Sequence, residues 1–186
     1  IVKCNLNDRI ESSMCSSPCG EIGVIGCYDG CVYGINLESG DTSWKFKTGQ
    51  MVKSSPALCL NGSAVVVGSY DHHLYCINVL DGHLIWSTKI GDGSIYASPC
   101  VSSINKCVYV ASLDGTCATV DENNGKLLWK WKLDSPVFSS PGIMPDEDIV
   151  VFAEVLGLVH FFSAVSGQKL WNFQAGGNIF SSFSIQ

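Results

Sequence analysis

The stretch VDENNGKLLWKW, residues 120–131, decides the fold, because its glycine-to-tryptophan spacing returns along the chain. A glycine precedes a tryptophan by four residues at Gly40–Trp44, Gly82–Trp86, Gly125–Trp129 and Gly167–Trp171. The four tryptophans are 42, 43 and 42 residues apart. A fixed period of this length is the sequence signature of a repeat architecture, in which each unit packs on its neighbours.

Two further landmarks keep the same phase in all four copies. A turn stands eleven residues before each glycine, at Asp29, Asp71, Asp114 and Leu156. Each repeat starts with a Ser-Pro-like pair, at Ser13-Met14, Ser55-Pro56, Ser98-Pro99 and Ser140-Pro141. The chain therefore divides into repeats at 13–54, 55–97, 98–139 and 140–181. By the same alignment, residues 1–12 are expected to form the last strand of a preceding unit, and residues 182–186 to start a further one.

Each repeat is predicted to contain four short strands. In the second copy these are residues 57–60, 64–70, 73–78 and 84–89, with a hairpin turn at Asn61-Gly62. The third copy repeats the pattern at residues 107–112, 116–121 and 127–132. No stretch of eleven or more residues has a helical period. A single four-stranded sheet cannot bury both faces, whereas sheets stacked radially can, so the sequence predicts an all-β chain folded as a β-propeller of four-stranded antiparallel blades.

The recurring tryptophans and glycines have a mechanical role in this prediction. The indoles of Trp44, Trp86, Trp129 and Trp171 are expected to lie flat against the next blade and to donate their N–H group to an acceptor there. Gly40, Gly82, Gly125 and Gly167 are expected to supply a left-handed backbone turn. These eight residues are the predicted structural docking site, and no catalytic, cofactor-binding or metal-binding residue is predicted.

The segments that end in these tryptophans resemble the tryptophan-docking motif of PQQ-type, or quinoprotein-like, β-propellers. That motif has a small residue, an Asp two positions later, a Gly-Lys pair and then Trp. The third copy matches it best, with Asp121, Gly125, Lys126 and Trp129, while Asn36, Asn78 and Ser163 replace the Asp elsewhere. The resemblance implies a ring of seven or eight blades, of which this chain would supply about half. Closure as a four-bladed ring is the alternative.

The cysteine-rich sequence is most similar to the C-terminal propellers of the β-alanine-activating enzyme family, which is adenylate-forming and related to nonribosomal peptide synthetases. This resemblance implies a non-catalytic scaffold or protein-recognition segment within a larger cytosolic enzyme that activates β-alanine with ATP and loads it on a phosphopantetheine carrier. The alternatives are part of a PQQ-dependent quinoprotein dehydrogenase, and a stress-sensor or assembly-factor propeller. The expected partners are other blades or domains of the same protein, and a protein or peptide at a channel mouth.

The ten cysteines are interpreted as free thiols. In the repeat alignment, Cys76, Cys107 and Cys117 occupy positions where other copies have Gly, Ala, Thr, Phe, Ile, Leu or Val, and these are interpreted as buried core positions that a free Cys fills well. Unpaired thiols favour a cytoplasmic location, and disulfides are the alternative. A metal site at Cys15, Cys19, Cys27 and Cys31 is a further alternative. We do not favour it, because the tight turns of zinc sites are missing. PQQ is not expected, because its sites in the dehydrogenases use adjacent cysteines and this chain has none.

Composition excludes other classes of function. The chain of 186 residues has a formal charge of −6, with one Arg and ten Lys, so a nucleic-acid backbone is not an expected partner. No apolar run approaches the roughly 18 residues that a membrane helix needs, so no membrane contact is expected. His72 and His73 at a hairpin tip, and the acidic run at 146–148, are interpreted as solvated turns.

Overall fold

Four antiparallel sheets of four strands each make up the fold in the computed structural model, which describes residues 3–183. The strands of each sheet follow one another in sequence, so every sheet is an up-and-down meander. The strands are β1 (Cys15–Ser16), β2 (Ile22–Gly26), β3 (Cys31–Asn36), β4 (Thr42–Lys47), β5 (Ala57–Cys59), β6 (Ala64–Gly68), β7 (His73–Asn78), β8 (Leu84–Lys89), β9 (Cys100–Ser102), β10 (Cys107–Ala111), β11 (Thr116–Asp121), β12 (Leu127–Lys132), β13 (Gly142–Ile143), β14 (Ile149–Ala153), β15 (Leu158–Ser163) and β16 (Lys169–Gln174).

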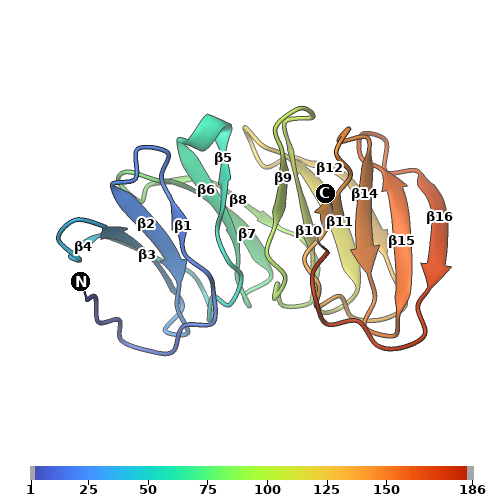
Figure 1. The fold of residues 1–186 in the computed structure, drawn as a ribbon, viewed down its shortest axis with the longest axis horizontal. Coiled ribbons are helices and arrows are strands. Elements are labelled where there is room, and N and C mark those ends of the chain that lie inside the picture. The colour runs from blue at the N-terminus through green and yellow to red at the C-terminus, as the bar shows by residue number, and fades with distance from the viewer. Residues whose placement is uncertain (1–2, 184–186) are drawn as a thin grey trace.

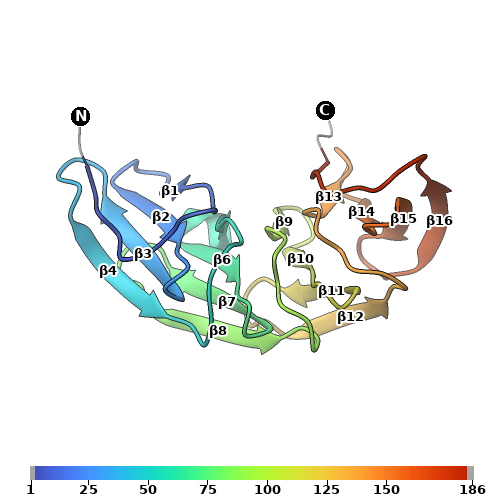
Figure 2. The same ribbon diagram turned by 90° about the horizontal axis from the view of Figure 1, so that it is seen from below.

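The four sheets stand side by side along an arc (Figure 1). We call them blades 1 to 4 in chain order. Seen from below, β4, β8, β12 and β16 lie along the convex side of the arc, and the first strand of each blade lies on its concave side (Figure 2). The predicted all-β propeller of four-stranded antiparallel blades is therefore confirmed.

The hydrophobic core lies between blades rather than within them. One cluster joins Val24 and Val32 of blade 1 to Val65, Val67 and Ile77 of blade 2. Similar clusters join blade 2 to blade 3 and blade 3 to blade 4. The second strand of a blade therefore packs on both faces, and β6 and β10 are buried at every residue. This explains why these strands have continuous apolar sequences and no polar alternation.

One β-bulge recurs at the same place in every blade. The register between the third and fourth strands shifts just after the residue that pairs with the tryptophan, for example between Cys76 and Ile77 opposite Trp86. The turn that follows the third strand contains Gly40, Gly82, Gly125 or Gly167, with φ angles of +82°, +73°, +70° and +69°. All four glycines therefore have the left-handed backbone that the repeat predicts.

The motif position before this turn needs only a hydrogen-bond acceptor. The side chain of Asp121 accepts the N–H groups of Asn123 and Asn124 at 2.8 and 3.2 Å. Asn36 and Asn78 accept equivalent backbone N–H groups, and Ser163 accepts one through its hydroxyl group. Replacement of the motif Asp by Asn or Ser therefore keeps the turn.

Two local predictions differ from the structure. The repeat predicts a strand over residues 1–12, but residues 3–14 form none, because no described strand lies beside them to pair with. Cys4 and Leu6 instead pack on the outer face of blade 1, which is the face of its sheet opposite to the one that contacts blade 2. The connection at Asn61-Gly62 is also wider than a two-residue hairpin, because Leu60–Gly62 form a 3₁₀ turn and Cys59 pairs with Ala64.

Candidate functional site

Each contact between neighbouring blades is built on the tryptophan of one blade and the backbone of the next. The indole N–H donates to a carbonyl oxygen one blade further on. The three bonds are Trp44 to Val79 at 3.0 Å, Trp86 to Glu122 at 2.9 Å and Trp129 to Ala164 at 3.1 Å. A buried indole N–H needs such a partner, and its orientation fixes how the two sheets meet.

The left-handed glycine of the next blade lies under the same ring. A Cβ atom on Gly82 would lie 2.7 Å from the ring of Trp44. A Cβ on Gly125 would lie 2.6 Å from the ring of Trp86, which is closer than carbon atoms pack. Both the backbone angle and the ring therefore require glycine here. Gly167 lies under Trp129 in the same way.

Trp171 differs from the other three tryptophans. Its side chain is 49% exposed, because no further blade among the described residues lies beside it. Its ring stacks on Phe161 of its own blade, with ring centroids 4.7 Å apart. The other blades have Gly34, Cys76 and Thr119 at the position of Phe161. A large residue replaces a small one in blade 4, and the indole stacks on it.

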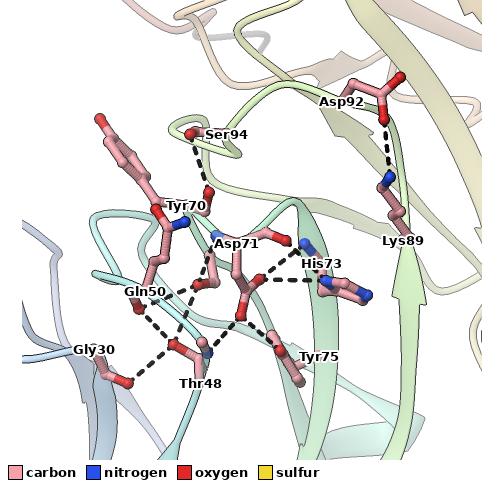
Figure 3. A network of polar contacts seen from close by, with 12 residues as sticks. Gly30, Thr48, Gln50, Tyr70, Asp71, His73, Tyr75, Lys89, Asp92 and Ser94 are labelled. Carbon is pink, nitrogen blue, oxygen red and sulfur yellow. Dashed lines mark hydrogen bonds and ion pairs between the residues drawn. The ribbon is translucent and has the colours of Figure 1, made fainter.

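A second contact between blades centres on Asp71, in the turn between β6 and β7 (Figure 3). One carboxylate oxygen accepts the N–H of His73 at 3.0 Å. The other accepts the hydroxyl proton of Tyr75 at 2.7 Å and the N–H of Gly49 at 2.6 Å. Gly49 lies in the connection from blade 1 to blade 2, so one carboxylate ties this connection to the tip of the second blade. Burial and the bond to Asp71 raise the pKa of Tyr75 above its ordinary value.

The same connection is tied to blade 1. The hydroxyl group of Thr48 lies 2.9 Å from the carbonyl oxygen of Gly30 and 2.6 Å from that of Gln50 (Figure 3). Blade 3 repeats the arrangement, since Asp114 accepts the N–H of Asp92 at 3.1 Å. Blade 4 has Leu156 at this position and so lacks the carboxylate. These turn residues therefore hold neighbouring blades together.

Two glutamates link blades at the opposite end of the strands. Glu122 of blade 3 accepts the N–H of Leu60 in blade 2 through its side chain, in addition to the indole N–H at its carbonyl. Glu147 accepts the hydroxyl proton of Ser102 at 2.5 Å and the N–H of Ile104 at 2.9 Å. The acidic run at 146–148 was predicted to be solvated, and for Glu147 this is wrong, because the side chain reaches across to blade 3.

A buried polar group lies in blade 4. The carboxylate of Glu154 lies 2.7 Å from Nε2 of His160 and accepts the hydroxyl proton of Ser135 at 2.7 Å. All three residues are buried, and Ser135 belongs to the connection from blade 3. Burial raises the pKa of Glu154, but the bonds from Ser135 and His160 hold this pKa below its ordinary value. The sequence gives no sign of this group, because its members do not share one repeat position.

The histidines predicted to lie in a solvated turn and the cysteines predicted to lie in the core can both be placed in the structure. His72 has a φ of +77° where the other hairpins have glycine, and both His72 and His73 are half-buried rather than solvated. Cys76, Cys107 and Cys117 are buried in the core, as expected. All ten cysteines are unpaired, although Sγ of Cys59 and Sγ of Cys76 lie 3.6 Å apart.

The metal site considered at Cys15, Cys19, Cys27 and Cys31 does not form in the described part of the chain. Among residues 3–183, no three His, Cys, Asp or Glu side chains gather closely enough to hold a metal ion. Cys15 and Cys19 are partly or fully exposed, whereas Cys27 and Cys31 are buried in the hydrophobic cluster on the outer face of blade 1. The four thiols therefore do not share one environment.

The concave side of the arc has a hollow of about 210 Å³. Its walls come from the segments that enter the first strand of successive blades, and its lining residues are Glu11, Lys53, Ser55, Tyr96, Ala97, Ser98, Phe138, Ser140, Phe180 and Ser182. The sequence prediction identified the repeated serines but missed the residue two positions before each. That position holds Glu, Lys, Tyr, Phe and Phe in order, so its chemistry changes between copies while the flanking pattern is kept.

The comparisons with known proteins agree with this fold. A family model described as the β-propeller of the β-alanine-activating enzyme matches residues 1–186. The β-alanine-activating enzyme of Drosophila melanogaster is 34% identical over 169 residues, which cover 89% of this chain and 17% of that protein. The chain therefore spans less than a fifth of the length of this relative.

Two solved structures show the same architecture at low sequence identity. BamB from Moraxella catarrhalis aligns with a TM-score of 0.77 and 18% identity, over 92% of this chain and 50% of that one. A chain of the mitotic checkpoint complex aligns with a TM-score of 0.77 and 16% identity, over 91% and 52% of the two chains. In residues 3–183 no helix is long and apolar enough to cross a bilayer. The chain belongs to the β-propeller family of the β-alanine-activating enzyme.

Proposed function

We propose that this chain is a non-catalytic scaffold and protein-recognition segment of a larger enzyme related to the β-alanine-activating enzyme. Family membership supports the relation, and the small share of the Drosophila protein that the chain matches supports a larger parent. The parent would activate β-alanine with ATP through domains outside this chain. We propose a cytoplasmic location, which the ten unpaired thiols support.

The observation that carries this proposal is the use of side chains at the blade contacts. Trp44, Trp86 and Trp129 donate to the next blade, and Asp71 and Asp114 accept from the preceding connection. These aromatic and acidic side chains are thus engaged in holding the sheets in register. In this proposal the eight predicted docking residues are structural, and the exposed surfaces of the array contact other domains.

A larger ring is part of the same proposal. The chain aligns with about half of each of the two solved propeller chains, which supports a parent ring with further blades. The exposed indole of Trp171 would then dock on the next blade in the manner of Trp86. No PQQ is proposed in this segment.

The test uses the intact protein that contains this chain. Trp86→Ala weakens one blade contact, and Leu80→Ala, a change at a side chain 60% exposed, is the matched control. We expect β-alanine-dependent ATP–pyrophosphate exchange to stay within about twofold of wild type in both variants, because the activating chemistry lies elsewhere. Transfer of β-alanine to its acceptor is expected to fall in Trp86→Ala only. A parallel loss of exchange in that variant, or saturable binding of PQQ with Ca²⁺ to this chain, would contradict the proposal.

A further inference from the structure

The concave hollow is lined by one series of side chains in continuous contact. Glu11, Lys53, Tyr96, Phe138 and Phe180 occupy the same position in successive repeats. The Nζ atom of Lys53 lies 3.6 Å from a carboxylate oxygen of Glu11 and 5.8 Å from the ring centre of Tyr96. The ring of Phe138 follows, with its centroid 5.6 Å from that of Tyr96 and 5.7 Å from that of Phe180. The series therefore changes from charged to apolar along the arc.

The Lys53 ammonium is held in a fixed place. Its Nζ atom lies 4.8 Å from the ring centre of Tyr28 and 5.1 Å from that of Tyr70, in addition to Tyr96. Three aromatic rings stabilise a cation by their quadrupoles. Contact with Tyr28 also raises the pKa of Lys53, so the amine stays charged at neutral pH.

The carboxylate of Glu11 is shared between two cations, because it is paired with Arg9 as well as with Lys53. Lys53 and Glu11 are the charged residues among those that line the hollow, and Arg9 lies outside it. A ligand carboxylate could pair with Lys53 while Glu11 stays paired with Arg9.

A row of serines forms the floor beside this series. The backbone N–H of Ser55 donates to the hydroxyl oxygen of Ser98 at 2.9 Å, and that of Ser98 to the hydroxyl oxygen of Ser140 at 3.0 Å. Ser13 donates in the same way to Ser55, and Ser140 to Ser182. Within residues 3–183, the hydroxyl groups of Ser55, Ser98 and Ser140 donate to no other residue. They therefore form a row of O–H donors that can meet carbonyl oxygens.

We propose that this hollow binds an extended peptide segment that carries one carboxylate next to apolar side chains. The inference rests on the proposed recognition role and names the partner's chemistry. The carboxylate would meet Lys53, the apolar side chains would contact Phe138 and Phe180, and main-chain carbonyls would accept from the serine row. The volume of about 210 Å³ is below the roughly 300–1,000 Å³ of small-molecule pockets, which suits a few peptide side chains rather than an enclosed cofactor.

The test starts with selection of binders from a phage-displayed library of random dodecapeptides on the intact protein. We expect enrichment of peptides with Asp or Glu within a few positions of Phe, Leu or Trp. Binding of an enriched peptide is then measured by fluorescence anisotropy. Lys53→Gln is expected to weaken it about tenfold or more, since a charge-assisted contact is lost, and Phe138→Ala similarly. Lys126→Gln, an equal change of charge at an exposed turn outside the hollow, is expected to have no effect.

A change on the peptide keeps the test decisive if a variant is unstable. Replacing the peptide carboxylate by an amide should weaken binding to wild type by about the same factor, and should cost nothing further in Lys53→Gln. Selected peptides without acidic residues, or peptides that bind Lys53→Gln as well as wild type, overturn the site but leave a recognition role at another surface. A selection that enriches no peptide also overturns the site, and the scaffold role is then judged by the transfer assay alone.

Discussion

The contribution of one indole to stability can be worked out from its surroundings. Trp86 is 7% exposed, lies on Gly125 of the next blade and donates to the carbonyl oxygen of Glu122. Removing a buried Trp side chain costs roughly 3–5 kcal/mol. At about 4 kcal/mol, Trp86→Ala is expected to lower the melting temperature by about 8–16 °C, since about 2–4 °C accompanies each kcal/mol in a domain of this size.

The assay is thermal unfolding of the chain, followed by far-ultraviolet circular dichroism. Trp171→Ala is the matched control, because it removes the same side chain at a place where half of it is exposed and where, among residues 3–183, its indole donates no bond to another blade. We expect that variant to lose less than about 2 kcal/mol. Trp86→Phe keeps one ring but loses the N–H donor and part of the buried surface, so its loss is expected to lie between zero and that of Trp86→Ala. Equal losses in Trp86→Ala and Trp171→Ala would refute the reasoning.

Three further outcomes follow from the structure. Gly125→Ala should cost more than Gly20→Ala in urea denaturation, because both have φ near +70° but only the first meets the preceding indole; equal midpoints would contradict this. Burial raises the pKa of Asp114, but bonds from neighbouring side chains hold this pKa below its ordinary value. The free energy of unfolding should therefore fall as the pH drops below about 4, and it should fall less steeply in Asp114→Asn. Burial raises the pKa of Cys100 to about 11, so iodoacetamide at pH 8 should label the exposed Cys19 first by mass spectrometry, and equal labelling rates would disagree.

The architecture could be predicted because its determinants are local and periodic. The left-handed turn at Gly125 and the wedge at Trp129 depend on residues four positions apart, so any copy shows the pattern. The strands at 73–78 and 84–89 match the structure residue for residue for the same reason. The edges of the repeat array were harder to predict, because a strand at residues 1–12 needs a partner that the repeat does not contain.

The contacts between blades could be predicted only in part. The hydrogen bond from Gly49 to Asp71 joins two loops whose distance no period reveals. The series from Glu11 to Phe180 escaped notice because a repeat search looks for sameness, and this position changes chemistry in most copies. Glu154 and His160 pair through positions that hold serine and alanine in blade 3. Partners of this kind become visible only with coordinates.

The indole contact has a direction, and this limits how such arrays can associate. Each blade presents a ring and an N–H group on one flank, and a glycine and a carbonyl oxygen on the other. Two identical flanks cannot satisfy each other, so this contact always joins the ring flank of one array to the glycine flank of another. Association through it is therefore head to tail, and it ends in either a closed circle or an open filament.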